Sequence, residues 1–406
     1  MDNFRTGALR TREVRPSGQG ARNREPGLQF RVNMPNGTAA DIERAGASAR
    51  GDDDIYTAPR TSHNFDPPLE RELRQSIEDL EGNAPMLARM ARFHLGWIET
   101  NGEPTADDVR QSVQGKRIRP HLAFLSCAAV GGEPMRAAPL AAAIELLHNF
   151  TLIHDDIQDR SPNRRHRATV WRIWGDAQAI NAGDALFALA QRALLRTDPV
   201  HVPSETLIQL LDAFNRMTIE IVRGQVLDLE FEGRANVTPS DYLAMIGGKT
   251  AAIVRYAAWA GAIVGGASEA TAQGLGEFGE ALGLGFQLRD DVLGIWGSDD
   301  ETGKDQTDDI RRRKKSLPIL MLLDRVQGEE AERLRERYRS DAIDETGVAE
   351  IRRLLETHGI HSDATAQVAH YHRIATESLD QVFGGRPESE SAALLQMVAR
   401  LDARRS

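Results

Sequence analysis

From Asp66 to the C-terminus, the apolar residues of this chain recur at helical spacing almost without interruption. Segments rich in Ala and Leu place apolar residues every three or four positions, and the period-two runs typical of strands are absent. Breakers such as Gly131-Gly132 and Ser161-Pro162-Asn163 separate the segments. The pattern predicts an all-α domain over residues 66–406, folded as a single large helical bundle. Its helices are expected at 70–98, 118–131, 136–160, 177–196, 204–231, 240–264, 269–296, 316–326, 345–357, 363–382 and 389–403.

Composition bounds the class of protein. A chain of 406 residues with 41% hydrophobic content can bury a large core, and a formal net charge of −10 argues against a general nucleic-acid binder. The single cysteine, Cys127, lies in an apolar run and is expected to be a core residue. No apolar stretch is long enough for a transmembrane segment, and no secretory signal is visible, so a cytoplasmic location is expected.

Residues 1–65 differ in composition from the rest of the chain. They hold ten arginines and eight acidic residues but no lysine, with many Gly, Asn, Pro and Ser. This composition predicts a disordered N-terminal extension. Three interpretations remain open: a solvated tail, a segment that docks on a protein partner or a compartment shell, and an organelle transit peptide, which the acidic residues disfavour.

An acidic segment at the end of a predicted helix carries the strongest chemical signal. Asp155 and Asp159 stand one helical turn apart, beside Asp156, and the arginines Arg164 and Arg165 follow. Two carboxylates about 6 Å apart repel by roughly 2–3 kcal/mol at an effective dielectric of about 20. A divalent cation turns that repulsion into attraction, and Mg²⁺ prefers one or two carboxylates together with phosphate oxygens. The segment therefore predicts a metal-diphosphate site.

Two further segments can complete such a site. Asp290 and Asp291 follow Phe286-Gln287 near the end of another predicted helix, and facing helices of a bundle can build a metal site from inward-pointing side chains. The run Gly115-Lys116-Arg117-Ile118-Arg119-Pro120 adds a cationic loop that can hold a second anion. Two acidic helix ends and a basic loop are expected to meet around a central cavity.

These motifs resemble those of the trans-isoprenyl diphosphate synthases, the all-α prenyltransferases that make geranyl, farnesyl and geranylgeranyl diphosphates. The resemblance covers roughly residues 70–403, and the order and spacing of the motifs make it specific. The matching positions are 115–120, 155–159, 164–165, 179–184, 224–225 with Asp228, 249–250, 286–291, 303–304 and Lys314 before 317–318. The resemblance implies the isoprenoid synthase type of bundle, a homodimer, and an enzyme that joins isopentenyl diphosphate to an allylic diphosphate (dimethylallyl, geranyl or farnesyl).

The resemblance also implies a role for individual residues. The isopentenyl diphosphate would be held by Lys116, Arg119, His148 and Arg165. The allylic diphosphate would be held by Arg164, Lys249, Lys304 and Lys314. A cluster of Mg²⁺, usually three ions and with Mn²⁺ as a substitute, would be bound directly by Asp155, Asp159 and Asp290, with Asp156 and Asp291 in outer-shell or water-mediated roles.

The implied reaction begins with ionisation of the allylic carbon–oxygen bond. Metal ions and cationic side chains neutralise the leaving diphosphate, and a dry pocket protects the allylic carbocation from water. The candidates for stabilising that cation are Thr250, Gln287 and the helix carbonyls near a break expected at Gly247-Gly248. The released diphosphate is the usual candidate for the final proton acceptor in this family.

Several of these residues also have plainer interpretations. Taken without the resemblance, His148 is expected to be a hydrogen-bonded core histidine. Gln225 and Asp228 are equally expected to be polar contacts between helices. The run Arg311-Arg312-Arg313-Lys314-Lys315 matches the pattern of a nuclear or nucleic-acid patch, but charge runs are usually solvated faces, and only Lys314 aligns with a family ligand.

Two positions depart from the family pattern. Gly294 stands where a third aspartate is common, from which a reduced metal affinity is expected, and His166 replaces the glycine that often follows the arginine pair. Product length in the family is set by bulk one to two turns before the first aspartate. Here Phe150 and Thr151 occupy those positions, and a single aromatic residue there favours geranylgeranyl diphosphate over farnesyl diphosphate.

Two other functions compete with this one. A class I terpene cyclase shares the bundle, but cyclases usually carry an Asn-Ser-Glu triad at the second motif, where this chain has Asp290-Asp291. A non-catalytic subunit, or a cargo protein docked through residues 1–65, is the second alternative. The intact Asp155, Asp159 and Lys249 argue against it.

Overall fold

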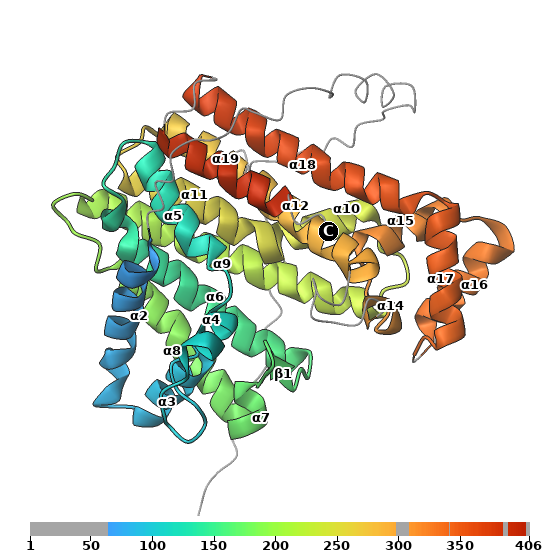
Figure 1. Ribbon diagram of the computed structural model, residues 1–406, viewed down its shortest axis with the longest axis horizontal. Coiled ribbons are helices and arrows are strands. Elements are labelled where there is room, and N and C mark those ends of the chain that lie inside the picture. The colour runs from blue at the N-terminus through green and yellow to red at the C-terminus, as the bar shows by residue number, and fades with distance from the viewer. Residues whose placement is uncertain (1–63, 298–307, 341, 385–388, 403–406) are drawn as a thin grey trace, which may run out of the picture. The chain divides into compact units, whose positions relative to one another are not determined.

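The computed structural model describes residues 64–297, 308–340, 342–384 and 389–402. Within these ranges the chain is almost entirely helical, and the only strands form one short hairpin (Figure 1). This confirms the predicted all-α class. Residues 1–63 of the predicted N-terminal extension lie outside the described residues. In the described part of the chain, no helix is both long enough and apolar enough to cross a membrane.

The N-terminal half of the helical domain contains the acidic and cationic segments around the first motif. Its elements are α2 (Asp66–Glu81), α3 (Pro85–His94), α4 (Asp107–Gln114), α5 (Ile118–Ala129), the 3₁₀ turn η1 (Pro134–Ala137), α6 (Ala138–Gln158), β1 (Asn163–Arg164), β2 (Arg167–Ala168), α7 (Val170–Trp174) and α8 (Asp176–Leu194).

The C-terminal half contains the second motif. Its elements are α9 (Ser204–Gly233), α10 (Pro239–Ile246), the π-helical turn η2 (Gly247–Ala251), α11 (Ala252–Val264), α12 (Glu269–Trp296), α14 (Asp308–Arg311), α15 (Leu317–Arg325), α16 (Gly328–Arg339), α17 (Glu345–Thr357), α18 (Ile360–Phe383) and α19 (Ser389–Asp402).

Most predicted helices are present, and the differences have local causes. The helix expected at 70–98 is two helices, because Gly82 ends α2 and Pro85 starts α3. The break expected at Gly247-Gly248 is instead the turn η2, which keeps α10 and α11 continuous. Short or highly charged elements such as α4, α16 and the hairpin were not predicted, because they lack a long apolar stripe.

The main core lies among long helices that approach one another closely at small residues. Helices α12 and α18 run side by side (Figure 1), and α11 packs between α5 and α12. A Cβ placed on Gly261 of α11 would lie 2.4 Å from the Ala123 carbonyl oxygen of α5. Helix α6 is buried without interruption from Ala138 to Leu147. Cys127 is fully buried in this core, as expected.

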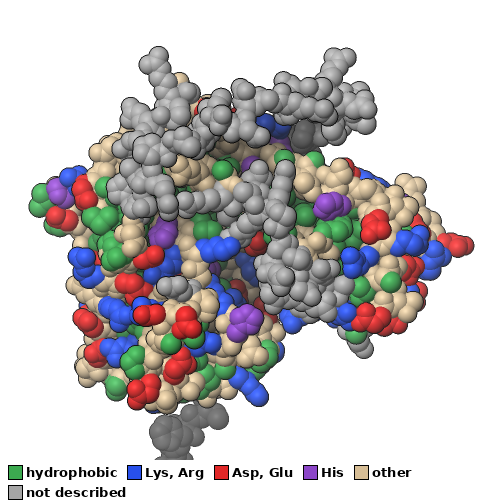
Figure 2. Space-filling model, in the orientation of Figure 1, with side chains coloured by type: hydrophobic (Ala, Val, Ile, Leu, Met, Phe, Trp, Pro, Cys, Tyr) green, Lys and Arg blue, Asp and Glu red, His purple; other side chains and the backbone are tan. Residues whose placement is uncertain are grey.

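A second apolar cluster joins the C-terminal part of α12 to α14, α15, α16 and α17. Ile295, Ile310 and Leu322 are fully buried within it. This cluster holds α14 beside the end of α12, close to the second acidic motif. On the visible face of the described residues, acidic and basic side chains are interspersed (Figure 2).

Candidate active site

The last three turns of α6 present one polar face to the interior. Glu145, Asn149 and Asp156 share this face and are each less than 10% exposed, and His148 and Asp155 lie beside them at helical spacing. Asp155 is half-buried, and Asp159, which caps the helix, is exposed. This face thus carries buried carboxylates within the bundle and an exposed carboxylate at the C-terminal end of the helix.

Asp156 is held by Arg164 from the hairpin. Arg164 Nε donates to both carboxylate oxygens of Asp156, at 2.9 and 3.1 Å, and Arg164 Nη2 lies 2.9 Å from Asp156 Oδ1. Burial raises the pKa of Asp156 to about 6, and the Arg164 charge opposes that shift. This forked pair ties the hairpin to α6.

The turn of the hairpin has an uncommon backbone. Arg165 (φ 50°) and His166 (φ 63°) both lie in the left-handed region, as a type I′ two-residue turn requires. Glycine or asparagine is usual at these positions, so a non-glycine pair carries backbone strain. His166 thus stands where the conformation, as well as the family pattern, favours glycine.

Arg165 points to the cationic loop instead of to Asp156. Its Nη1 donates to the Val113 carbonyl oxygen, and its guanidinium occupies the space beside Gly115, where a Cβ would lie 2.7 Å from Nη2. Two consecutive arginines therefore serve different neighbours. Arg164 joins the acidic motif, and Arg165 joins the loop at residues 115–120.

Within this loop, Arg117 has a structural role. It is buried, adopts a left-handed backbone, and pairs with Glu70 and with Asp66 at 3.6 Å. Arg119, in contrast, lies beside α6, with its Nη1 3.3 Å from His148 Nε2. Burial lowers the pKa of Arg119, and the charges of Glu145 and Asp290 oppose that shift. Arg119 is therefore close to α6 and to the second acidic motif.

The carboxylates of Asp155 and Asp159 are influenced by the positive charge of Lys249 on η2. Burial raises the pKa of both groups, and the positive charge of Lys249 opposes the shift in each case. Lys249 Nζ lies 2.5 Å from Asp228 Oδ2. The turn η2 packs so tightly on α9 that a Cβ on Gly224 would lie 2.2 Å from the Lys249 backbone nitrogen. Asp228 is therefore an interhelical contact that places Lys249 opposite the first motif.

A chain of polar side chains links η2 to the second motif. Thr250 Oγ1 donates to Gln287 Oε1 at 3.0 Å, and Gln287 Nε2 donates to Asp291 Oδ1 at 3.3 Å. Asp291 is fully buried and accepts from the Tyr242 hydroxyl and from the Leu317 backbone N–H. Asp290, the preceding residue, is exposed. The two motifs thus share a pattern in which the second aspartate is buried and the first is more accessible.

This pattern fits the donor chemistry of a magnesium site. Asp155, Asp159 and Asp290 offer accessible carboxylates, the oxygen ligands that Mg²⁺ prefers. Among the described residues, no group of three or more His, Cys, Asp or Glu side chains is close enough to hold a metal ion by itself. Mg²⁺ commonly takes one or two carboxylates together with the phosphate oxygens of a substrate.

The structure brings together most of the predicted site residues. Lys249, Thr250 and Gln287 form one group with the acidic motifs, and Arg119, His148 and Arg165 form another around the loop that carries Lys116. Lys314 lies 3.5 Å from Asp291 Oδ1. Lys304 lies outside the described residues. Phe150 packs against Phe187 of α8 and against His154, and the Thr151 hydroxyl donates to the His148 carbonyl oxygen at 2.7 Å.

The basic run at residues 311–315 is not a uniform solvated face. Arg311 pairs with Glu345, Arg313 donates to the Ser340 carbonyl oxygen, and Lys315 donates to the carbonyl oxygens of Phe231, Glu232 and Arg234 at the end of α9. Arg312 is close enough for its charge to lower the pKa of Asp159, against the larger raising effect of burial. The run therefore fixes this segment against three neighbours.

Some residues near the site were not predicted. Tyr242 carries no local signal, because its contact with Asp291 depends on tertiary packing. Asp309 belongs to the acidic pair Asp308-Asp309 downstream of the second motif, but its contact with Lys314 could not be predicted from sequence. Glu145 does have a signal, since it is the one charged residue in the apolar run 137–147. His94 lines a cavity of about 30 Å³, the space of roughly one water, together with Asn149, Asp156, Arg164, Arg165 and Arg167.

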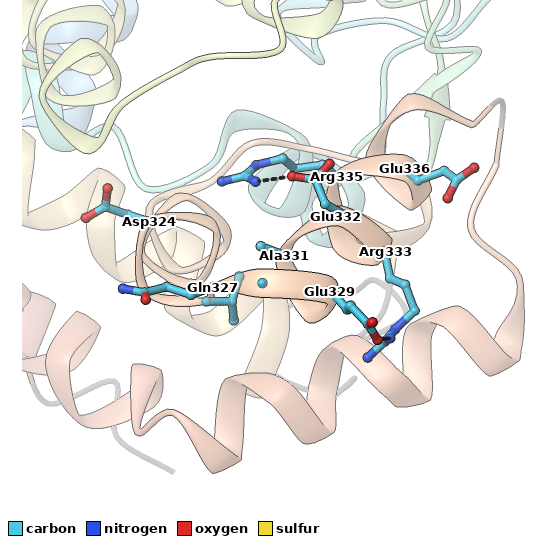
Figure 3. Close-up of a pocket in the computed structure, with 10 residues that line it drawn as sticks. Asp324, Gln327, Glu329, Ala331, Glu332, Arg333, Arg335 and Glu336 are labelled. Carbon is cyan, nitrogen blue, oxygen red and sulfur yellow. Dashed lines mark hydrogen bonds and ion pairs between the residues drawn. The ribbon is translucent and has the colours of Figure 1, made fainter.

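A larger hollow, of about 840 Å³, lies away from these residues at the start of α16 (Figure 3). Its charged side chains pair with each other, as in Glu332 with Arg335 at 2.9 Å and Glu329 with Arg333 at 3.7 Å. These exposed pairs satisfy one another and contribute little to binding. The hollow is therefore separate from the candidate active site.

Comparison with known proteins identifies the family. Residues 106–355 match the family model of the polyprenyl synthetases. The chain is also 39% identical over 331 residues to the (2E,6E)-farnesyl diphosphate synthase of Mycobacterium tuberculosis H37Rv, covering 79% of this chain and 86% of that protein. The chain belongs to the polyprenyl synthetase family. It is a trans-prenyltransferase of the short-chain isoprenyl diphosphate synthase type, as the motifs predicted.

Other members of the polyprenyl synthetase family differ in their products. A geranylgeranyl diphosphate synthase of Mycobacterium tuberculosis is 41% identical over 253 residues, covering 62% of this chain and 68% of that protein. The solved structure of a polyprenyl synthetase from Streptomyces coelicolor A3(2) aligns with a TM-score of 0.72 at 37% identity, covering 83% of this chain and 99% of that one. The match confirms the predicted fold.

The buried His94 predicts a pH dependence of stability. Burial, with the charges of Arg164 and Arg165, lowers its pKa from 6.5 to about 3, so the folded protein holds it neutral. The unfolded chain takes up a proton below 6.5, so this contribution is complete above that pH and is lost as the pH falls toward 3. His94→Gln should reduce the slope of unfolding free energy between about pH 7 and about pH 5, by up to about 1.4 kcal/mol per pH unit.

Urea unfolding at a series of pH values measures that slope. The matched control is His201→Gln, which changes an exposed histidine and should leave the slope as in the wild type. An identical slope in His94→Gln and the wild type would contradict the prediction.

Proposed function

We propose that this protein is a Mg²⁺-dependent enzyme that condenses isopentenyl diphosphate with an allylic diphosphate by ionisation, condensation and elimination. The observation that carries the proposal is the division between Arg164 and Arg165. One arginine is paired with the acidic motif and the next lies on the cationic loop. Two adjacent anion-binding groups, of which only one has carboxylates for metal, suit two diphosphate substrates in one site.

On the allylic side, Arg164, Lys249 and Lys314 hold the leaving diphosphate, and Lys304 belongs to the same proposed set. Asp155, Asp159 and Asp290 would hold Mg²⁺, which would supply positive charge against the diphosphate that leaves when the carbon–oxygen bond breaks. The buried Asp156 does not need to touch the metal, because its carboxylate fixes Arg164. Asp291 in turn fixes Gln287 and Lys314.

On the isopentenyl side, Lys116, Arg119, His148 and Arg165 hold the second diphosphate. The pKa of His148 lies well below its usual value, first because of burial and then because of Arg119. A neutral imidazole here can donate or accept one hydrogen bond without adding charge. The Thr250 hydroxyl and the Gln287 amide oxygen lie together, where they can face the allylic carbocation with their dipoles.

Incubating the purified protein with Mg²⁺, isopentenyl diphosphate and each allylic diphosphate in turn tests the proposal. Prenyl diphosphates should form, and mass analysis of the dephosphorylated prenols identifies them. Asp155→Ala should abolish turnover with every starter, a loss of at least about 10³-fold, because the metal loses a direct ligand. Cyclic hydrocarbons formed without isopentenyl diphosphate would instead identify a terpene cyclase.

We further propose that geranylgeranyl diphosphate is favoured over farnesyl diphosphate as product. The relatives include synthases named for each product, so the preference depends on this chain's own residues. Phe150 lies five residues before Asp155 on α6, and its ring is 5.3 Å from that of Phe187 and 4.7 Å from that of His154. Phe150 is the only Phe, Tyr or Trp in α6, and Thr151 beside it is small.

Replacing Phe150 by Ala should lengthen the products. Removal of the ring opens space where the growing chain would end, without changing the charged groups that perform the reaction. The product distribution, measured by mass analysis of the prenols, should shift toward longer chains while total turnover stays within about tenfold of the wild type. Phe124→Leu, a change in the buried core on α5, where the ring stacks on Phe65, is the control. An unchanged distribution would remove Phe150 from the proposed role.

We also propose that the protein acts as a homodimer that pairs through α9. Five large apolar side chains on α9 are each more than a third exposed. Their spacing along the helix places them on one face. They are Ile208, Ile219, Val222, Val226 and Leu229. An exposed apolar stripe of this length is typical of an interface.

Val226→Glu should convert the dimer to a monomer, because it places a charge within the stripe. Light scattering coupled to gel filtration measures the mass. The matched control is Val200→Glu, which puts the same charge at a valine that is 81% exposed outside α9 and should leave the mass unchanged. A wild-type protein that is monomeric at micromolar concentration would refute the pairing.

A further inference from the structure

Gly294 lies in the last turn of α12, and the space beside it is occupied. A Cβ placed on Gly294 would lie 2.4 Å from Asp309 Oδ2 and 3.2 Å from Asp309 Cγ. Real Cβ atoms do not approach other atoms as closely as 2.4 Å, so the Asp309 carboxylate fills the space that any larger side chain at position 294 would need. Asp309 reaches this place from α14, which packs against α12.

The same carboxylate contacts a cation of the active site. Lys314 Nζ lies 3.5 Å from Asp309 Oδ2 and 3.5 Å from Asp291 Oδ1, so the ammonium group stands between two carboxylates. Asp291 is fixed by Tyr242 and by the Leu317 backbone N–H. The Lys314 side chain itself is 45% exposed and accessible to a ligand.

We propose that Asp309 supplies the carboxylate that the second acidic motif lacks at Gly294, and that it acts as a positioning residue for Lys314. The inference rests on the proposed function, in which Lys314 holds the allylic diphosphate. It replaces the expectation that Gly294 merely weakens the motif. Glycine at 294 is what lets a carboxylate from α14 enter the motif.

The physical basis is preorganisation. A lysine side chain has several rotatable bonds, and ordering it when the diphosphate binds reduces the affinity. Two carboxylates that hold the ammonium group beforehand remove much of that loss. If a side chain at 294 displaced Asp309, Lys314 would keep only the buried Asp291 as a partner. The affinity for the allylic diphosphate should then fall, while the loop that holds isopentenyl diphosphate is unaffected.

Gly294→Ala tests this inference, because it should leave the stability of the fold unchanged or higher while it weakens binding of the allylic diphosphate. Alanine favours a helix over glycine, and the Asp309 carboxylate is the far end of a flexible side chain that can swing aside, so the melting temperature should hold or rise. The KM for the allylic diphosphate should nevertheless rise roughly tenfold, with the KM for isopentenyl diphosphate unchanged. Gly82→Ala, a glycine at a helix end with open space around it, is the control.

A double-mutant cycle with Asp309→Asn decides whether Gly294→Ala acts through Asp309. Asp309→Asn alone should raise the allylic KM by a similar factor, and adding Gly294→Ala to it should have no further effect. Gly294→Asp, which restores the common family residue, should impair allylic binding in the same way. Asp79→Asn removes an ion pair with Arg192 far from the motif and should leave both KM values unchanged.

An unchanged allylic KM in Gly294→Ala, or fully additive effects in the double mutant, would overturn the inference. Either result, obtained with a wild-type enzyme that makes prenyl diphosphates, would leave the proposed function intact. Failure of the wild type to form any prenyl diphosphate would instead reject the proposed function. The two failures are thus distinguishable in one set of assays.

Discussion

The pairing of Asp156 with Arg164 is the interaction on which the rest of the candidate site depends. A carboxylate that is 2% exposed cannot remain charged inside a bundle without a partner, and here the partner comes from the only hairpin among the described residues. Fixing Arg164 on α6 also fixes the next residue. Arg165 is directed away from Asp156 and onto the loop at 115–120 because the tight turn reverses the chain at that point. One buried ion pair thus places both anion-binding groups.

Close approach of backbones is the second requirement. Gly224 of α9 and Gly248 of η2 let these elements touch, with a Cβ on Gly248 only 2.7 Å from the Glu220 carbonyl oxygen. The π-helical turn at 247–251 widens the helix where Lys249 and Thr250 leave it. As a result, Lys249 can reach Asp228 on α9 while Thr250 bonds to Gln287 on α12. A regular helix would turn these two side chains by about 100° per residue without that adjustment.

The sequence predicts the parts of this arrangement that depend on local pattern. Apolar periodicity predicts the helices that carry Asp155 and Asp290. The spacing of the aspartates along one helix face predicts that they act together. The hairpin could not be predicted from sequence, because Arg165 and His166 form a turn in which glycine or asparagine is the usual residue. Tyr242 and Asp291 are 49 residues apart, and no local rule links them. Gly294 was taken for a missing ligand, because sequence alone does not reveal that Asp309 fills the space beside it.

The two acidic motifs share one arrangement, in which the second aspartate is buried and holds a cationic side chain. Asp156 and Asp291 are both almost fully buried, and each holds a cation, Arg164 or Lys314, that is much more exposed. A buried carboxylate is costly to leave unpaired, so its cation stays in place when the neighbouring anion departs. Asp155, Asp159 and Asp290 are more accessible, and they are the metal ligands of the proposed function. Under the proposed function, the residue order Asp-Asp in each motif separates a group that would contact the ligand from a group that orders the protein around it.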